Sequence, residues 1–183
     1  VEERFAAVGV TPKVIKDFSL KIGEALVASG SEVAHIDVMI GRTDGPVGEA
    51  FANAKANPTP GHEALLAVLE PNLAVRPPTL IIPTVTIKNL RQSQMIFGPA
   101  QAGVAKGVTD SVTDGIIPKD ATDELAIIAN VFVHPSAVDR HRIFINNWKA
   151  MRQAVRRAME GRPTIEELER DKEAARHPFK HTP

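Results

Sequence analysis

Residues 31–41 decide the architecture of this chain, and they read Ser31-Glu32-Val33-Ala34-His35-Ile36-Asp37-Val38-Met39-Ile40-Gly41. The stretch is rich in β-branched and other apolar residues and is bounded by Gly30 and Gly41, which predicts a β-strand. Side chains alternate between the two faces of a strand, so the even-numbered positions 34–40 form one unbroken apolar face for a core. His35 and Asp37 lie on the other face.

The polar pair on the second face is a candidate site. At about 3.3 Å of rise per residue, the Cβ atoms of His35 and Asp37 lie roughly 6.6 Å apart, close enough to share one small pocket. The alternative is that this face is simply solvated, because a histidine and a carboxylate two residues apart carry no specificity without partners elsewhere in the chain. The spacing leaves both interpretations open.

The composition is that of an ordinary soluble globular protein. Its 183 residues, 43% hydrophobic and 24% charged, suffice for one domain with a substantial core. Lys and Arg number 22 and Asp and Glu number 22, so charge does not favour nucleic acid or a membrane surface as a partner. The absence of cysteine excludes disulfides, thiolate catalysis and Cys-based zinc sites. The sequence shows no secretory signal or membrane-length apolar run, so the cytoplasm is the expected location.

Apolar alternation and turn residues predict the other elements. A polar extension, 1–17, precedes strands expected at 18–27, 31–41, 64–69, 79–88 and 125–133. Pro83 inside the fourth strand favours an edge position or a bulge. Helices are expected at 47–57, from Gly98 to Gly115, and at 136–160 before Gly161. This order predicts an α+β fold, a two-layer sandwich of a mixed sheet with packed helices. The expected domain covers 18–161, and the tail over 162–183 is a surface helix or an arm that grips a neighbour.

Three further places carry side chains suited to binding, each with a plain structural alternative. Leu66 lies in the third strand, where a leucine is more often an ordinary core residue. Thr84, Thr86 and Lys88 are expected on one face of the fourth strand, which is also what the solvent side of an edge strand looks like. Gln101 falls in the first turn of a helix, where unpaired N–H groups can receive an anion, although a glutamine there is more often a surface residue.

Motifs for several other chemistries are missing. The chain has no P-loop, no GxGxxG with a partner carboxylate, no HExxH and no GxSxG. Its remaining histidines, at positions 62, 134, 141, 177 and 181, show no metal-ligand spacing with carboxylates. We therefore expect no metal.

Six sequence blocks follow one another in order along the chain. They are Glu24-Ala25-Leu26-Val27, Glu32-Val33-Ala34-His35-Ile36-Asp37, Leu65-Leu66-Ala67-Val68 with Pro71-Asn72-Leu73, Val85-Thr86-Ile87, Phe97-Gly98-Pro99-Ala100-Gln101 and Gly115-Ile116-Ile117-Pro118. Together these blocks resemble the formaldehyde-activating enzyme family, and six collinear blocks are far more specific than any one of them. The resemblance runs from about residue 18 to 161, and His177-Pro178-Phe179 is similar to the family's C-terminal end.

The resemblance implies a hydro-lyase that condenses formaldehyde with tetrahydromethanopterin, giving methylene-tetrahydromethanopterin and water. It also implies a homopentamer with pterin sites between subunits. The implied fold is the left-handed βαβ type shared with a ribosomal small-subunit protein and the GHMP kinases. The family's catalytic histidine falls on His35, and its binding residues fall on Asp37, Leu66, Thr86 and Gln101.

One position departs from the family. Where the family has a lysine that contacts the cofactor, two residues before the threonine matched by Thr86, this chain has Thr84. The change removes a cation from the expected site, and Lys88, further along the same expected strand face, is a candidate replacement. Two alternatives to the family's activity follow. The first is a pterin or formaldehyde binding protein without turnover, and the second is the same chemistry on another reduced pterin or amine.

The implied reaction suits a histidine. Formaldehyde adds to amines unaided, so dehydration of the carbinolamine is the step worth catalysing, and this step needs a proton at the leaving oxygen. An imidazole with an unperturbed pKa of about 6.5 can give and recover that proton near neutral pH. We expect His35 to act as this general acid, and Asp37 to orient a pterin N–H group or to favour the imidazolium. Leu66 is expected to pack on the ring system and Gln101 to bond a pterin edge.

Overall fold

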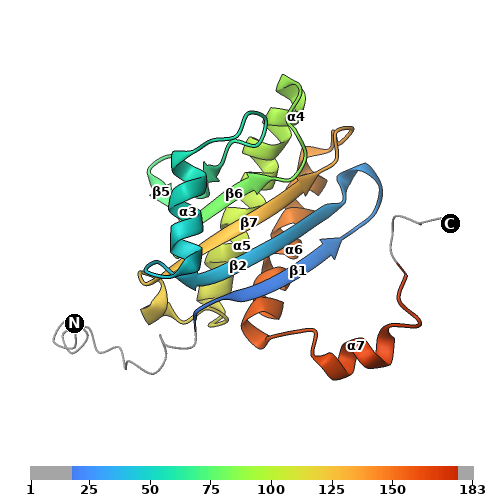
Figure 1. The fold of residues 1–183 in the computed structure, drawn as a ribbon. Coiled ribbons are helices and arrows are strands. Elements are labelled where there is room, and N and C mark those ends of the chain that lie inside the picture. The colour runs from blue at the N-terminus through green and yellow to red at the C-terminus, as the bar shows by residue number, and fades with distance from the viewer. Residues whose placement is uncertain (1–17, 177–183) are drawn as a thin grey trace.

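The strand that carries His35 lies second in a five-stranded mixed sheet (Figure 1). The computed structural model describes residues 18–176, so the expected extension 1–17 and the block His177-Pro178-Phe179 lie outside the described residues. The order β1-β2-β7-β6-β3 consists of β1 Lys21–Val27, β2 Ala34–Arg42, β7 Leu125–Val133, β6 Thr79–Pro83 and β3 Leu65–Leu66. β6 and β7 are parallel and are joined through helices, whereas the other neighbouring pairs are antiparallel. The α+β class that the sequence predicts is confirmed.

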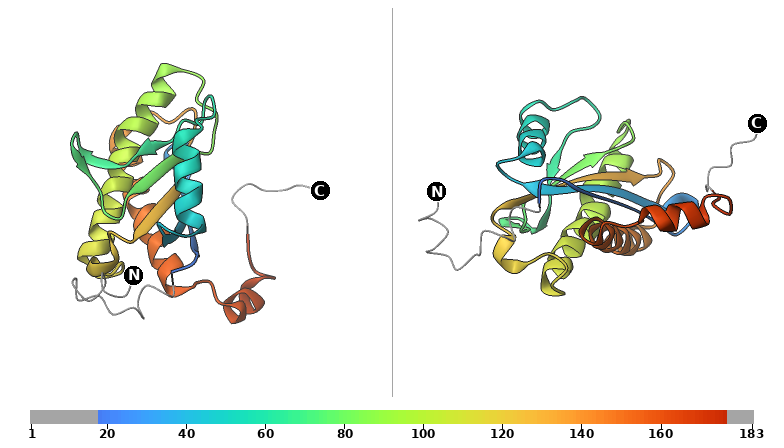
Figure 2. Two further views of the ribbon diagram at one scale, coloured as in Figure 1. Left: turned by 60° about the vertical axis from the view of Figure 1, so that its left-hand side comes forward. Right: turned by 60° about the horizontal axis from the view of Figure 1, so that its bottom comes forward.

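One face of the sheet is buried under two helices. α5 (Gln101–Thr113) and α6 (Arg140–Glu160) lie side by side against this face (Figure 2). The even-numbered side chains of β2 and the odd-numbered side chains of β7 point into this core, as strand alternation requires. In β2 the fully buried residues are Ala34, Ile36, Val38 and Ile40.

The opposite face of the sheet is only partly covered. Helix α3 (Pro46–Ala56) packs there through Val47 and Phe51 (Figure 2). The sheet residues in this second cluster are Met39, Ile82, Ala126 and Ile128. The expected two-layer arrangement therefore gains a partial third layer, because these apolar side chains need a cover of their own. We call the part of this face that α3 leaves uncovered the open face.

Strand β1 approaches α6 closely because it has a glycine at the contact. A Cβ atom on Gly23 would lie 2.1 Å from the carbonyl oxygen of Ala154 and 2.6 Å from the amide nitrogen of Ala158. Both neighbours are backbone atoms, so a side chain at this position would push the strand off the helix. The close contact brings the next residue, Glu24, within reach of Arg157 on α6.

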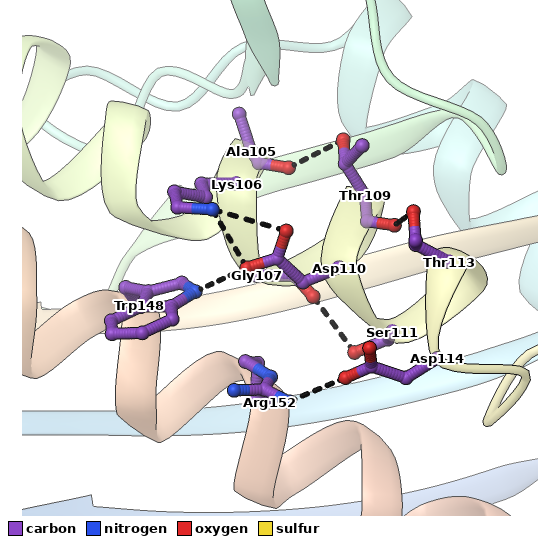
Figure 3. A network of polar contacts seen from close by, with 10 residues as sticks. All are labelled: Ala105, Lys106, Gly107, Thr109, Asp110, Ser111, Thr113, Asp114, Trp148 and Arg152. Atoms are coloured by element: carbon purple, nitrogen blue, oxygen red, sulfur yellow. Dashed lines mark hydrogen bonds and ion pairs between the residues drawn. The ribbon is translucent and has the colours of Figure 1, made fainter.

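Side chains on α5 and α6 form a polar network that connects the two helices (Figure 3). The indole Nε1 of Trp148 donates to Asp110 Oδ2 at 2.8 Å, and Lys106 Nζ donates to the same oxygen at 2.9 Å. Partial burial raises the pKa of Asp110, but the hydrogen bonds from Lys106 and Trp148 outweigh it, so that pKa is lowered overall. Lys106 and Arg152 also lie over the Trp148 ring, 5.3 and 5.5 Å from its centroid. These non-covalent contacts hold α5 and α6 together beneath the sheet.

The helical segment before β7 begins earlier than the sequence predicts. α4 (Leu90–Met95) leads through a π-helical turn, Ile96–Ala100, directly into α5. Asn89 starts α4, because its side chain accepts a hydrogen bond from the backbone N–H of Gln92 at 2.9 Å. The expected start at Gly98 is wrong, since Pro99 lies inside the π-helical turn and not at a helix N-terminus.

The fourth strand is shorter than predicted. β6 ends at Pro83, so the expected strand over 79–88 is wrong beyond that residue. Its neighbour β3 pairs only as far as Ile81, and Pro83 has no N–H with which to extend a ladder. The third expected strand is also divided, into β3 and β4 (Val68–Glu70), and β4 pairs with β5 (Leu73–Ala74) in a separate hairpin.

The C-terminal helices follow the sequence pattern closely. α6 begins at Arg140 rather than at 136 and ends, as predicted, at Gly161, which has a left-handed φ of 66°. α7 (Ile165–Asp171) follows in the expected tail, and Thr164 starts it with a capping box. Short 3₁₀ turns lie at Gly30–Glu32 and Lys119–Ala121. Over residues 18–176, no helix is both long and apolar enough to cross a bilayer.

Candidate active site on the open face of the sheet

His35 and Asp37 point away from the main core, as strand alternation predicts. Their side chains are 38% and 44% exposed, so both reach solvent from an inner strand of the sheet. In the sheet, His35 lies between Leu26 of β1 and Phe132 of β7. The imidazole is therefore flanked by two apolar side chains on rigid strands.

A second carboxylate completes this cluster, and sequence reasoning missed it. Glu24 lies directly opposite Asp37 in the antiparallel β1–β2 pair. The Nε2 atom of His35 lies 3.0 Å from Glu24 Oε1 and 3.6 Å from Asp37 Oδ1. The hairpin register was the signal that could have found it: once Val27 pairs with Ala34, Glu24 must pair with Asp37.

The contact with Glu24 distinguishes the two nitrogens of His35. Nε2 faces the Glu24 carboxylate as an ion-pair contact, which is favourable when the imidazole is protonated. Nδ1 is the ring nitrogen on the other side of the imidazole. A histidine so placed can give and recover a proton.

Hydrogen bonds from α6 and from the residues just before it hold the strands that carry this cluster. Arg157 Nη1 donates to the backbone carbonyl of Glu24 at 2.7 Å and lies 3.8 Å from its carboxylate. Just before β2, the Glu32 carboxylate accepts a hydrogen bond from the Val138 backbone N–H at 3.3 Å. The carbonyl of Glu32 accepts a second bond, from the Asn146 side chain at 2.7 Å. The helix layer thus positions the strand residues on the far side of the sheet.

Strand β7 adds two half-buried side chains that sequence reasoning did not single out. Asn130 lies opposite Asp37, and Phe132 lies opposite His35. Asn130 was visible in the sequence only as the single polar residue of an apolar strand. Its place beside Asp37 depends on the β2–β7 register, which joins segments about 90 residues apart and which local pattern does not report.

Thr84 lies at the same end of the sheet as His35. Its backbone N–H donates to the Val131 carbonyl at 3.1 Å, which continues the parallel β6–β7 alignment by one residue beyond Pro83. This alignment places Thr84 two strands away from His35, roughly 10 Å at about 4.8 Å per strand. The side chain is exposed, with Oγ1 3.4 Å from the same carbonyl.

The expected common strand face of Thr84, Thr86 and Lys88 is wrong, because β6 ends before all three. The segment that follows is a loop, in which Thr86 Oγ1 lies 3.0 Å from Nε2 of His62. Lys88 lies further along, where the chain enters α4. Lys88 is therefore not an along-strand replacement for a cation at position 84.

Leu66 is far from His35 within one subunit. It pairs with Leu80, which aligns with Ile128, so it belongs to a row of the sheet that ends on Met39 of β2. Leu66 lies three strands away from His35 across the sheet, and its row is displaced from His35 by four residues along the strand direction. These correspond to roughly 14 Å and 13 Å, or roughly 20 Å in all. One subunit does not bring Leu66 and His35 into one pocket.

Gln101 is buried and has a structural partner. Its side-chain Oε1 accepts a hydrogen bond from the backbone N–H of Val68 at 2.7 Å. Its own backbone N–H bonds to the carbonyls of Ile96 and Gly98, because α5 continues the π-helical turn. The anion-binding helix terminus considered for Gln101 is therefore wrong. The side-chain N–H groups are the part of this residue that a ligand can still use as donors.

A groove of about 620 Å³ opens beside Glu24, between α6 and α7. Its lining contains four arginines and four carboxylates, so it has no charge preference, and we assign no ligand to it. Over the described part of the chain, no group of three or more His, Asp or Glu side chains could hold a metal ion. The expectation of a metal-free site stays a prediction.

Comparison with known proteins places the chain among named relatives. A sequence model described as formaldehyde-activating enzyme (Fae) matches residues 22–180. A relative from Methanosarcina barkeri, named 5,6,7,8-tetrahydromethanopterin hydro-lyase, is 52% identical over 158 residues, which are 86% of this chain and 89% of the relative. A relative from Archaeoglobus fulgidus, named bifunctional enzyme Fae/Hps, is 50% identical over 159 residues. These are 87% of this chain and 40% of that relative, so the chain spans less than half of the bifunctional protein.

The match to the family model covers most of the chain and includes every candidate site residue named so far. The identity to the Methanosarcina barkeri hydro-lyase extends over nearly the full length of both sequences. On these grounds, the chain belongs to the formaldehyde-activating enzyme family.

Proposed function

We propose that the protein condenses formaldehyde with tetrahydromethanopterin, giving methylene-tetrahydromethanopterin and water. The observation that carries the proposal is the exposed imidazole of His35, whose Nε2 atom lies against the carboxylate of Glu24. The name of the Methanosarcina barkeri relative, a tetrahydromethanopterin hydro-lyase, supports the same reaction. A cytoplasmic location stays an expectation from the sequence.

The slow step in this reaction is loss of water from the carbinolamine that formaldehyde and the pterin amine form. Protonated His35 gives a ring proton to the departing hydroxyl oxygen, which leaves as water. The electron pair of the amine nitrogen forms the iminium, and closure by the second amine returns a proton to the imidazole. A positioned general acid contributes about 10²–10⁴-fold to such a step. Glu24 contributes by keeping the ring in one orientation.

The proposed ligand contacts come from two separated groups of residues. His35, Asp37, Thr84 and Thr86 belong to one end of the sheet, whereas Leu66 and Gln101 belong to the region of β3 and the start of α5. A homopentamer with its site between subunits would bring the second group of one subunit to the first group of the next.

A formaldehyde-dependent spectroscopic assay tests the proposed function. The rate of methylene-pterin formation is measured with and without the protein, using tetrahydromethanopterin and several other reduced pterins. We expect acceleration above the spontaneous rate with tetrahydromethanopterin. Binding of the pterin without acceleration would instead identify a carrier or sensor, and acceleration with a different pterin alone would identify a changed cofactor.

The alternatives of a carrier and of a changed cofactor rest on Thr84, because the cation expected from the family is missing at this position. A hydrogen bond to a charged group in a sheltered site is worth about 1.5–3 kcal/mol, or roughly 10–150-fold in affinity. We therefore expect Thr84→Lys to tighten tetrahydromethanopterin binding by roughly 10–150-fold, measured by fluorescence titration or calorimetry. The exposed position of Thr84 leaves room for the longer side chain.

Lys88→Ala is the matched control for this change. Lys88 lies at the start of α4, beyond the end of β6, so removal of its charge should alter pterin affinity less than two-fold, about 0.4 kcal/mol. Tight binding by the wild type that neither substitution alters would show that Thr84 is a neutral replacement. A large loss in Lys88→Ala would show that the loop presents Lys88 to the ligand.

A further inference from the structure

His62 is a second histidine close to the proposed site, and its two ring nitrogens both have partners. It lies in the loop between α3 and β3, where Nδ1 is 2.7 Å from the carbonyl oxygen of Pro83. Nε2 is 3.0 Å from the hydroxyl oxygen of Thr86. The ring therefore bridges the end of β6 and the loop that follows it.

The partners determine where the hydrogens lie. A carbonyl oxygen only accepts hydrogen bonds, so Nδ1 of His62 carries the hydrogen of that contact. A neutral imidazole has one N–H, so Nε2 carries the lone pair. Nε2 must then accept, and the hydroxyl of Thr86 must donate its only hydrogen to it.

Backbone contacts hold the two segments in this arrangement. The amide of Ile87 donates to the Gly61 carbonyl at 2.9 Å. A Cβ atom on Gly61 would lie 2.7 Å from the methyl group of Thr86, and Gly61 has a φ of 78°, a value that favours glycine. The loop that carries His62 is thus packed against the methyl group of Thr86, on the segment that presents the Thr86 hydroxyl to His62.

We propose that His62 is a positioning residue that fixes the Thr86 hydroxyl as a hydrogen-bond acceptor toward the ligand. With its hydrogen committed to His62, the exposed Thr86 oxygen presents only lone pairs to a bound molecule. Thr86 then selects an N–H group of the ligand and disfavours a carbonyl at that place. This inference deepens the proposed function, because it rests on Thr86 lying in the pterin site.

The hydrogen positions are tested first, without reference to activity. The protein is labelled with nitrogen-15 histidine, and the His62 signals are assigned by their loss in His62→Gln. At about pH 8.5, where an ordinary histidine is neutral, the spectrum should show the proton on Nδ1. A proton on Nε2 overturns the inference, whatever the protein is found to catalyse.

A double-mutant cycle tests whether His62 acts through Thr86. His62→Phe keeps a ring of similar size and removes both hydrogen bonds, so the KM for the pterin should rise about 3–10-fold while kcat changes less than two-fold. Thr86→Val keeps the shape and removes the hydroxyl, and we expect His62→Phe to have no further effect on KM in that background. His62→Gln, whose amide has one donor group and one acceptor, should restore much of the wild-type KM.

The matched control is His141→Gln, at an exposed position on α6. Its KM should equal that of the wild type. Additive effects of His62→Phe and Thr86→Val would show that His62 does not work through Thr86 and would overturn the proposal. If the wild type neither binds nor converts any reduced pterin, the proposed function fails, and the nitrogen-15 spectrum still decides the hydrogen positions at His62.

Discussion

Replacing His35 by alanine should lower the rate of methylene-tetrahydromethanopterin formation by about 10²–10⁴-fold, the usual contribution of a positioned general acid. The loss should appear in kcat, because the proton is needed only as the carbinolamine loses water. Pterin affinity should change little, since the proposed binding contacts come from other side chains. Steady-state kinetics above the spontaneous background, together with a binding titration, measure both quantities.

Thermal stability separates a catalytic histidine from a structural one. The His35 side chain is 38% exposed, and contacts between exposed charged groups are worth about 0–1 kcal/mol. We therefore expect His35→Ala to unfold at nearly the same temperature as the wild type. His141→Ala, on the exposed side of α6, is the control for loss of a histidine away from the sheet. Wild-type turnover in His35→Ala would remove His35 from the mechanism, and a stability loss as large as the rate loss would mark it as structural.

Two inactive variants should restore activity to each other if the site is shared between subunits. His35→Ala removes the proposed acid, and Leu66→Asp places a charge where the pterin ring is expected to pack. Because these residues lie roughly 20 Å apart in one subunit, an intact site needs the wild-type His35 of one subunit and the wild-type Leu66 of its neighbour. If equal amounts of the two variants assemble at random, about one quarter of the sites should be intact, and the mixture should show about one quarter of the wild-type activity. Either variant alone should show activity near zero.

The control pair for this experiment is His35→Ala with Asp37→Ala. These two residues lie on the same strand and the same face, so every mixed site carries one of the two defects, and the activity of the mixture should not exceed the average of the two variants measured alone. The assembled mass is measured by sedimentation or mass photometry on the same samples. A fully active monomer, or no recovery in the His35 and Leu66 mixture despite mixed assembly, would contradict a shared site.

The face that His35 and Asp37 occupy was predictable from local sequence. Alternation has a period of two residues, so an apolar set at positions 34–40 forces the residues between them to the other side, whatever the rest of the chain does. The C-terminal end of α6 was predictable for a similar reason. Gly161 can adopt the left-handed conformation that ends a helix, and this is a property of the residue itself.

The end of β6 was not predictable from local pattern. Thr84, Val85, Thr86 and Ile87 alternate as a strand would, but a strand continues only where a neighbour pairs with it. β3 stops at two residues, and the loop containing His62 occupies the place of further pairing. The two threonines consequently belong to a loop, and this loop gives His62 its contact with Thr86.

By itself, the sequence determined which side chains are candidates for the chemistry and which face of β2 presents His35 and Asp37, because residue identity and strand alternation are local properties. Only the tertiary structure decided their partners. Glu24 meets His35 through the β1–β2 register, Asn130 meets Asp37 through a pairing across about 90 residues, and Leu66 is kept apart by strand order. The chain adopts the register and strand order whose long-range pairings together bury the most apolar surface. A short stretch of sequence cannot reveal which pairing that is, because the competing partners lie elsewhere in the chain.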